Sequence, residues 1–313
     1  PRSLPATMLA FSIRRIFGAI PTLFVLITIS FFVMRVAPGG PFSGNRKITE
    51  AVLANLNRAY HLDEPIWMQF VRYLWGLAQF DFGPSMKYRD YSVTELIVQG
   101  LPVSIEIGLW AMLLATLAGI ALGIIGALRR NGMTDLSAGV IAMVGLAVPN
   151  FVIGPLLQNV FGLELRWLPI AGWDGSVNAK ILPILVLALP NIAYISRLTR
   201  GSMIESLRTN YVRTARAKGI GARRVVWKHA LTGAMLPVIA YLGPATAITV
   251  TGSVIVEDIF GIPGIGRYFV EGAANRDYPL VMGVTIIYGG IVILANIVTD
   301  VVRGIIDPKV SYE

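Results

Sequence analysis

Six stretches of this sequence are apolar over roughly the twenty residues that a helix needs to cross a lipid bilayer. They cover residues 13–34, 101–128, 136–161, 181–195, 234–256 and 280–298, and the fourth is so short that it must extend on one side. A surface helix of a soluble protein carries a polar face, whereas these stretches are apolar all round. One such helix fits a buried core, but six predict an all-α integral membrane protein with six transmembrane helices.

The composition of the chain excludes several other classes of protein. Hydrophobic residues make up 55% of the 313 residues and charged residues 14%, which excludes a disordered chain. There are no cysteines, so a disulfide framework is excluded. The first stretch is too long for the apolar region of a signal peptide, and no small-residue cleavage site follows it. We therefore expect it to be retained as a helix.

Most of the positive charge lies on one side of the predicted membrane helices. An even number of spans puts both chain ends on the same side, as tails at 1–12 and 305–313. The formal net charge is +9, and its basic excess is concentrated on that side, above all in the loop at 199–232. Because cytoplasmic loops carry an excess of Lys and Arg, we expect both termini and this loop to be cytoplasmic.

The spans divide the chain into an outer segment and a transmembrane domain. Residues 35–100, after the first span, form the outer segment, with helical periodicity at 48–60 and 66–80. Thr49 is a candidate N-cap for the first of these helices. The aromatic residues of the second are more often interface anchors than ligand binders, so both helices are expected on the membrane surface. Residues 101–304 form the transmembrane domain with the other five spans.

The loop at 199–232 predicts two short helices separated by glycines. We expect helices at 205–218 and 222–231, broken at Gly219 and Gly221, because glycine adopts backbone angles that other residues avoid. Two interpretations of this basic loop stay open: a polybasic segment on the lipid surface, or a docking element for an acidic partner. The small residues Ala215, Ala217 and Gly219 favour the docking interpretation, because small side chains let a partner approach the loop closely.

The last outer loop, at 257–279, contains a G-x-x-G-x-G pattern at 261–266. The pattern differs from the dinucleotide-binding fingerprint and does not follow a strand of a βαβ unit, so we reject nucleotide binding there. A rigid turn at a helix end is expected instead.

The sequence contains no motif for catalysis or metal binding. It has no P-loop, no H-E-x-x-H and no G-x-S-x-G. The two histidines, His61 and His229, are predicted on opposite sides of the membrane, and without cysteine a zinc site is disfavoured. We therefore expect no catalytic residue, metal or cofactor on this chain.

Polar and helix-breaking residues inside the spans indicate where a pathway would run. Glu106 is the one ionisable residue well inside a span. It could bond to another helix or take part in a pathway, and both alternatives stay open. Prolines and asparagines are expected to break the third to fifth spans, as packing kinks or around a central pathway. The candidate pathway residues are Glu106, Pro149, Asn150 and Asn191. The shortage of buried ionisable residues argues for an energy source outside the chain.

The basic loop resembles the loop motif of permease subunits of ABC importers. In that motif a Glu-Ala-Ala triplet precedes a Gly and, further on, a Leu-Pro pair. The matching residues here are Arg213-Thr214-Ala215, Gly219 and Leu236-Pro237. Arg replaces the motif's Glu and Thr232 replaces its Pro, departures that resemble the peptide-permease branch. Further matches spread the resemblance over nearly the whole chain; they include Tyr60-His61-Leu62-Asp63-Glu64-Pro65, Asp81-Phe82-Gly83, Asn275-Arg276-Asp277-Tyr278 and Asp307-Pro308-Lys309.

The chain resembles the B-type subunits of oligopeptide and dipeptide importers. This resemblance implies a type I importer permease fold in a bacterial inner membrane. It implies a sister permease subunit of the C type, two cytoplasmic ATPases that bind ATP and Mg, and an extracytoplasmic binding protein that delivers peptide. The lipid bilayer is the remaining partner, and no nucleic acid is implied. The residues expected to contact the ATPases are Tyr211, Arg213, Thr214, Ala215, Arg216, Ala217, Lys218, Gly219, Arg223 and Arg224.

Other functions stay open beside oligopeptide uptake. Related importers take up dipeptides, nickel chelates, glutathione or antimicrobial peptides, and substrate choice is expected to lie largely in the binding protein. A self-sufficient secondary transporter is the alternative from another class, and the shortage of buried ionisable residues counts against it.

Overall fold

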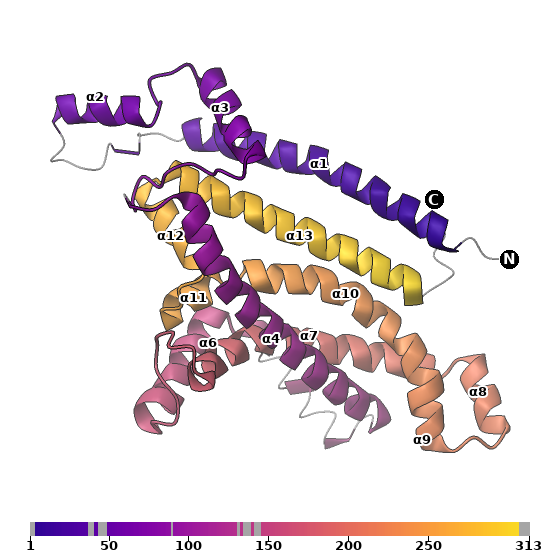
Figure 1. The fold of residues 1–313 in the computed structure, drawn as a ribbon. Coiled ribbons are helices and arrows are strands. Elements are labelled where there is room, and N and C mark those ends of the chain that lie inside the picture. The colour runs from indigo at the N-terminus through magenta and orange to yellow at the C-terminus, as the bar shows by residue number, and fades with distance from the viewer. Residues whose placement is uncertain are drawn as a thin grey trace.

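The computed structural model describes residues 4–36, 41–42, 49–88, 90–129, 132–133, 139–140 and 145–306. Every regular element in these ranges is a helix, and one isolated bridge pairs Pro84 with Ser92 (Figure 1). The prediction of an all-α protein is therefore confirmed for this part of the chain.

Five long helices of the described chain are long and apolar enough to cross a membrane. They are α1 (Leu4–Val36), α4 (Val93–Leu128), α7 (Val177–Ser206), α10 (Leu231–Thr251) and α13 (Tyr278–Ile306). The helix α10 is continuous with α9 (Ala222–Arg224) and η2 (Val225–Ala230), so this span begins at Ala222.

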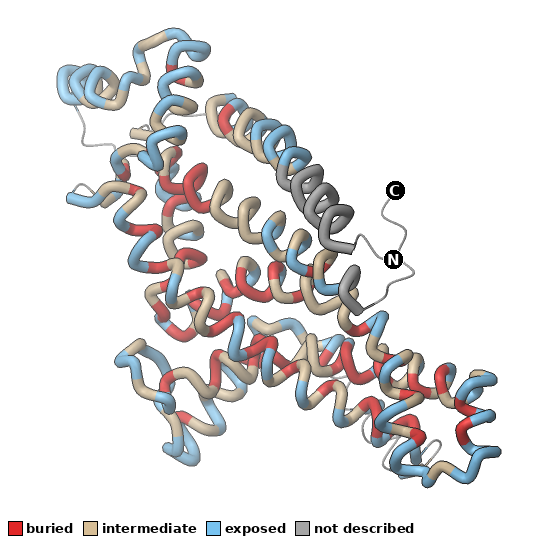
Figure 2. The backbone as a smooth tube through the Cα atoms, turned by 45° about the vertical axis from the view of Figure 1, so that its right-hand side comes forward, coloured by how far each residue is buried: buried red, intermediate tan, exposed pale blue. Residues whose placement is uncertain are grey.

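The surface of the long helices is apolar, while the core lies where they meet. Leu117 is 63% exposed, Ile248 66% and Leu294 62%. Figure 2 shows the buried residues gathered on the inner faces of the bundle and the exposed ones outside. Because so large an apolar surface is costly in water, the bundle suits lipid.

Most of the spans are longer than the apolar stretches that predicted them, but the fifth ends at Thr251, before the predicted residue 256. The second begins at Val93, because Ser92 forms a capping box: its Oγ accepts from Glu95 N at 3.2 Å, and Glu95 Oε2 accepts from Ser92 N at 2.8 Å. The fourth extends on both sides of 181–195, to Val177 and Ser206.

The third predicted span, 136–161, lies partly outside the described residues. In its described part the chain leaves the helical conformation at Val148 and Pro149, and α6 (Asn150–Leu157) and η1 (Gln158–Glu164) follow. Proline disfavours helical geometry in the residue before it, which explains the break. At the other proline sites the helix is not interrupted, because Pro190, Pro237 and Pro244 lie inside continuous helices, which leaves the packing-kink alternative open.

The basic loop also differs from its prediction. A single helix at 205–218 is wrong, because α7 runs to Ser206 and α8 (Asn210–Ala217) begins only after a turn. In that turn Thr209 Oγ1 donates to Ser206 O at 2.6 Å. The break at Gly219 is confirmed, whereas the helix expected at 222–231 continues into α10.

The short helices lie at the two ends of the bundle. At one end are α2 (Glu50–Ala59), α3 (Ile66–Ala78), α11 (Val254–Phe260) and α12 (Ile265–Asn275). The first two confirm the helices predicted in the outer segment, and Thr49 is the N-cap residue of α2. At the other end lie α8, α9, the start of α1 and the end of α13 (Figure 1). The basic loop and the two terminal helices thus share one end of the bundle.

The helices α4 and α7 pack along most of their length through glycines. A Cβ at Gly119 would lie 2.8 Å from Ile195 Cβ, and one at Gly123 would lie 2.7 Å from Ser196 O. Real Cβ atoms do not approach so closely, so these positions need glycine. Small residues at such crossings let two helix backbones approach within van der Waals contact in a membrane.

We predict that Gly123→Ala lowers the free energy of unfolding by about 1–3 kcal/mol, because the added methyl group must displace α7. Gly201→Ala, a control in an exposed helical position with nothing within 4 Å, should raise it by up to about 1 kcal/mol. Thermal unfolding followed by tryptophan fluorescence measures both. Equal midpoints for the two variants would contradict the close α4–α7 contact.

Candidate functional site

The α8 loop, residues 207–221 between α7 and α9, is held to the bundle by one face of α8. Val212 and Ala215 lie three residues apart and therefore on the same face. They are 0% and 5% exposed, in one hydrophobic cluster with Met203 and Val225. The loop is therefore a packed part of the fold.

Tyr211 ties the start of α8 to its neighbours. Its hydroxyl lies 3.0 Å from Ser206 Oγ, which itself donates to Ala230 O at 2.7 Å. The tyrosine must then be the donor in the first bond. A Cβ at Gly233 would lie 2.7 Å from the Tyr211 hydroxyl, so glycine there makes room for it. These contacts join α7, α8 and η2.

Gly219 ends α8 in the left-handed conformation, with φ at 74°. Its N–H donates to Arg216 O at 2.9 Å, and Ile220 N–H donates to Ala215 O at 3.3 Å. This closes the helix in the way that C-terminal glycines commonly do. A Cβ at Gly219 would meet nothing within 4 Å, so the requirement for glycine is conformational.

The outward face of the α8 loop and α9 is basic. Residues 210–224 contain no acidic side chain, and the exposed positions among them include Arg213, Thr214, Arg216, Ala217, Lys218, Arg223 and Arg224. The structure corrects one expectation: Ala215 packs into this chain's own core and is not available for docking, whereas Ala217 is exposed. The spacing of Val212 and Ala215 is the sequence signal that distinguishes the two faces.

A polar cluster joins the middle of α7 to two positions on α10. Tyr241 hydroxyl donates to Asn191 Oδ1 at 3.0 Å, and Asn191 Nδ2 donates to Thr249 Oγ1 at 3.0 Å. Tyr194 stacks on Tyr241 with ring centroids 4.2 Å apart and is 44% exposed. We call Asn191, Tyr194, Tyr241 and Thr249 the α7–α10 polar cluster. The sequence argument identified only Asn191, because its hydrogen-bond partners Tyr241 and Thr249 lie 50 and 58 residues further along the chain.

The other predicted pathway residues lie apart from this cluster. Glu106 Oε1 pairs with Lys180 Nζ at 2.6 Å, so its bond to another helix is the alternative that the structure supports. Asn191 lies about 16 Å further along α7 than Lys180 at the usual rise per residue. Pro149 and Asn150 stand at the start of α6, where Asn150 Oδ1 is buried with no partner in the described chain. Nowhere in the described ranges do three histidine or acidic side chains gather as a metal site.

At the end of the bundle opposite α8, a buried carboxylate holds the helices α4, α11 and α12 together. Glu257 on α11 is 0% exposed. Its Oε1 accepts from Ser104 Oγ of α4 at 2.7 Å and from Ser253 Oγ, and its Oε2 accepts from Gly266 N of α12 at 2.8 Å and Arg267 N at 3.2 Å. A buried polar side chain is tolerated when it is hydrogen-bonded in this way.

The glycines of the G-x-x-G-x-G pattern surround this carboxylate. Gly261 takes φ of 63° at the end of α11, which confirms the turn expected at a helix end. A Cβ at Gly264 would overlap the Glu257 carboxylate, and one at Gly266 would lie 2.8 Å from its Oε2. The pattern is therefore a loop wrapped around Glu257, a role that the sequence argument missed.

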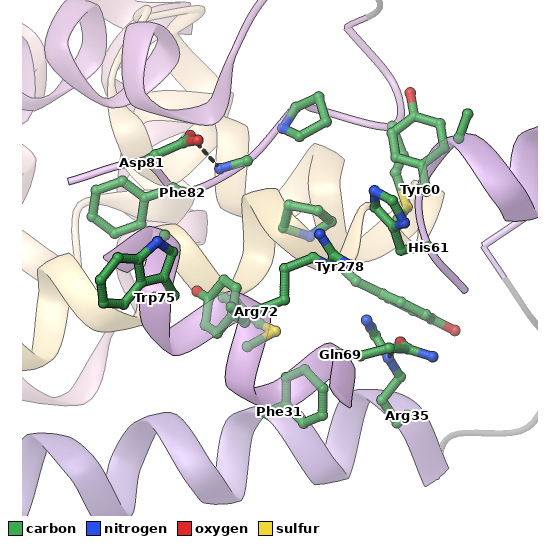
Figure 3. Close-up of a pocket in the computed structure, with 18 of the residues that line it drawn as sticks. Phe31, Arg35, Tyr60, His61, Gln69, Arg72, Trp75, Asp81, Phe82 and Tyr278 are labelled. Carbon is green, nitrogen blue, oxygen red and sulfur yellow. Dashed lines mark hydrogen bonds between the residues drawn. The ribbon is translucent and has the colours of Figure 1, made fainter. Parts of the chain in front are cut away.

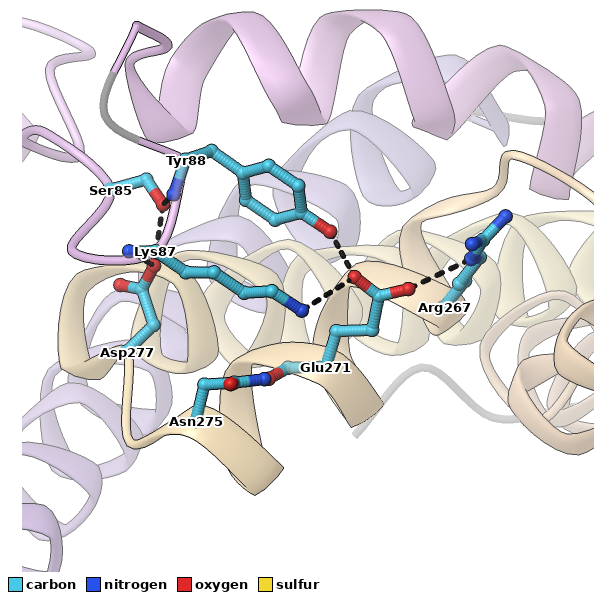
Figure 4. Close-up of polar contacts among 7 residues, drawn as sticks. All are labelled: Ser85, Lys87, Tyr88, Arg267, Glu271, Asn275 and Asp277. Carbon is cyan, nitrogen blue, oxygen red and sulfur yellow. Dashed lines mark hydrogen bonds and ion pairs between the residues drawn. The ribbon is translucent and has the colours of Figure 1, made fainter. Parts of the chain in front are cut away.

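Two more carboxylates fasten the outer segment to the bundle (Figure 4). Asp277 is buried, caps α13 by accepting from Leu280 N, and accepts from Ser85 Oγ at 2.5 Å and from Lys87 N at 3.0 Å. Glu271 on α12 accepts from Lys87 Nζ at 2.9 Å, from Arg267 Nε at 2.9 Å and from the Tyr88 hydroxyl.

These contacts set the pKa of Glu271. Partial burial raises the pKa, but the hydrogen bonds from Tyr88, Lys87 and Arg267 outweigh it and lower the pKa to about 2. For Tyr88, burial and then the bond to Glu271 raise the pKa above its ordinary value. The ionised carboxylate is thus the form that holds Lys87 and Tyr88 against α12.

Family models of membrane transport proteins match nearly all of this chain. The model described as binding-protein-dependent transport system inner membrane component matches residues 119–312, and a model for the N-terminal part of such membrane components matches residues 8–107. The chain belongs to this family, whose members are multi-pass proteins of the inner membrane.

Similar proteins of known role are peptide permeases. The oligopeptide transport system permease protein OppB of Salmonella typhimurium is 51% identical over 306 residues, which cover 97% of this chain and 100% of the relative. OppB of Escherichia coli K12 is 50% identical and is covered to the same extent, 97% of this chain and 100% of the relative. The dipeptide transport system permease protein DppB of Bacillus subtilis is 42% identical, covering 97% of this chain and 98% of the relative.

Solved structures with a similar fold are ABC transporters. An amino acid ABC transporter matches with a TM-score of 0.54 at 17% identity, covering 67% of this chain and 94% of its own. The methionine transporter MetNI, in an inward-facing conformation, matches with a TM-score of 0.53 at 16% identity. The match covers 68% of this chain and 96% of the MetNI chain. The fold is that of a type I importer permease.

We predict that Glu271 makes the stability of the outer end depend on pH. A carboxylate whose pKa is lowered on folding stabilises the fold fully above its unfolded pKa of about 4.3, and the stabilisation is lost as pH falls toward about 2. The difference in unfolding midpoint between the wild type and Glu271→Gln should therefore be largest near pH 7 and shrink by pH 3.

The exposed Glu50 on α2 provides the matched control. Glu50→Gln should leave the wild-type midpoint unchanged across the same pH range. A pH-independent difference for Glu271→Gln would show that its three hydrogen bonds do not depend on ionisation.

Proposed function

We propose that this chain is one of two membrane-spanning subunits of an ATP-driven importer of oligopeptides and forms half of the translocation pathway. The observation that carries the proposal is the match to oligopeptide permeases over 97% of the chain and the full length of the relatives. The 42% identity to a dipeptide permease makes dipeptides the second candidate substrate.

The partners follow from this role. A sister permease subunit would complete the pathway, two cytoplasmic ATPases would bind ATP and Mg, and an extracytoplasmic binding protein would deliver peptide. The chain itself is then a non-catalytic transport subunit. The basic loop, together with the adjoining ends of α1 and α13, supports a cytoplasmic location for this end of the bundle and for both termini (Figure 1).

The α8 loop is the element that we assign to coupling with an ATPase. Its inner face is anchored by Val212, Ala215 and Tyr211, so a force applied outside is transmitted to α7 and α10. Its outer face presents Ala217 for close approach. Together with α9 and η2 it exposes six basic side chains for an acidic partner: Arg213, Arg216, Lys218, Arg223, Arg224 and Lys228.

The α7–α10 polar cluster is the part of the pathway that the geometry supports best. A tyrosine with an exposed ring near the middle of a span is unfavourable against lipid tails but fits a water-filled route or a partner subunit. Asn191 lies in this cluster, whereas Glu106 serves as a structural ion pair near the outer end.

We predict that Gly219→Ala uncouples transport. Placing a side chain at a positive φ costs about 1–2 kcal/mol, enough to reduce peptide-stimulated ATP hydrolysis by about fivefold or more if α8 must keep its shape in the complex. The measurement uses the assembled transporter with its binding protein in proteoliposomes, with and without peptide.

Gly221→Ala is the matched control, because Gly221 lies in the same exposed loop with φ at −58°. It should retain most of the stimulation, and both variants should assemble. Normal peptide-stimulated ATP hydrolysis in Gly219→Ala would contradict the coupling role of the α8 loop. If no peptide stimulates ATP hydrolysis by the wild type, the proposed substrate class is wrong.

A further inference from the structure

A cavity of about 340 Å³ lies at the end of α1, between α1, α3, the outer segment and the start of α13. Figure 3 shows Arg35, Gln69 and Phe31 together on one side of it, and Asp81, Phe82 and Trp75 on the other. None of the pathway or coupling residues lines it.

Arg35 enters this cavity with part of its hydrogen-bonding capacity unused. Its Nε donates to Gln69 Oε1 at 2.9 Å, and its guanidinium lies over the rings of Phe31 at 4.8 Å and Tyr278 at 5.2 Å. Its Nη1, however, is buried and has no hydrogen-bond partner in the described chain. A buried donor without a partner is costly, and a charged one more so.

The neighbouring groups do not neutralise Arg35. Gln69 is fixed by donating to Leu62 O and Glu64 O, which leaves its oxygen for Arg35. Glu64 already pairs with Arg72 at 2.7 Å and His61 at 3.0 Å.

Asp81, the acidic residue that lines the cavity, accepts from Gly83 N at 2.9 Å. Figure 3 places it on the side away from Arg35.

Tyr73 adds a second unused donor. Tyr73 lines the same cavity, and its hydroxyl is also buried without a partner among the residues that the structure describes. A group that satisfies both donors must accept several hydrogen bonds and carry negative charge, as a phosphate or a carboxylate does.

The position of the cavity selects the phosphate of a lipid. Arg35 is next to the last residue of the apolar span Phe17–Val36, so it lies at headgroup depth. The adjoining helix α3 exposes Trp67 at 62% and Trp75 at 69%, as interfacial anchors do. At this depth the abundant acceptor is the phosphate of a phospholipid.

We propose that Arg35 and Tyr73 bind the phosphate of a phospholipid headgroup from the outer leaflet, so that a lipid is seated between α1, α3 and α13.

The test measures lipid binding to the full chain, purified with the subunits that assemble with it, by native mass spectrometry. The probes are dioctanoyl phosphatidylglycerol, dioctanoylglycerol without a phosphate, and inorganic phosphate. Phosphatidylglycerol should bind saturably and at least about tenfold more tightly than dioctanoylglycerol. Inorganic phosphate should bind more weakly than the lipid, because it lacks acyl contacts.

Variants locate the site. Arg35→Gln should weaken phosphatidylglycerol binding about tenfold or more, and Tyr73→Phe, which keeps the ring, about threefold. Arg58→Gln changes another outer-segment arginine that does not line the cavity, and it should bind as the wild type does.

Several results would overturn the proposal. Equal binding of phosphatidylglycerol by the wild type, Arg35→Gln and Tyr73→Phe would place any lipid elsewhere. Equal affinity for the two lipids would exclude recognition of phosphate, and tighter binding of inorganic phosphate would exclude a lipid as the source. If Arg35→Gln fails to assemble, Tyr73→Phe and the comparison of the two lipids decide the question.

Discussion

The buried carboxylate of Glu257 determines how the end of the bundle opposite α8 is built. It accepts hydrogen bonds from α4, from its own helix α11 and from the first turn of α12, with no exposure to solvent. Leaving a buried hydrogen-bonding group without its partner costs free energy, so these contacts hold the helices together. The glycines at 264 and 266 are required because any side chain there would displace the carboxylate. Asp277 and Glu271 then fasten the outer segment to this frame.

The two ends of the bundle are joined by closely packed helices. The glycine contacts between α4 and α7 bring their backbones together, and α10 joins them through the polar cluster around Asn191. At the far end, Tyr211, Ser206 and Ala230 attach α8 to α7 and η2. In the proposed coupling role, a displacement of α8 would therefore be passed to the same helices that carry the polar cluster.

Sequence reasoning recovered what lipid and composition dictate, and missed what distant contacts decide. The apolar stretches predicted the helices because a bilayer permits little else, and Gly219 was found because its break is local. Glu257 and Asp277 were missed as fastening points because Ser104 and Ser85, their partners, lie 153 and 192 residues away. The sequence could not show that the helices continue through Pro190 and Pro237, because in a membrane neighbouring groups can compensate for the backbone hydrogen bond that proline removes.

The central claim is that the exposed face of α8 contacts an ATPase, and photo-cross-linking tests it most directly. A p-benzoylphenylalanine residue placed at Ala217, which is exposed on α8, is compared with one at Ala54, which is exposed on α2 at the opposite end of the bundle. Both are irradiated in the assembled complex in native membranes. The account predicts a cross-link between position 217 and an ATPase subunit and none from position 54. Absence of that product at 217 in a complex that still hydrolyses ATP in response to peptide would contradict it.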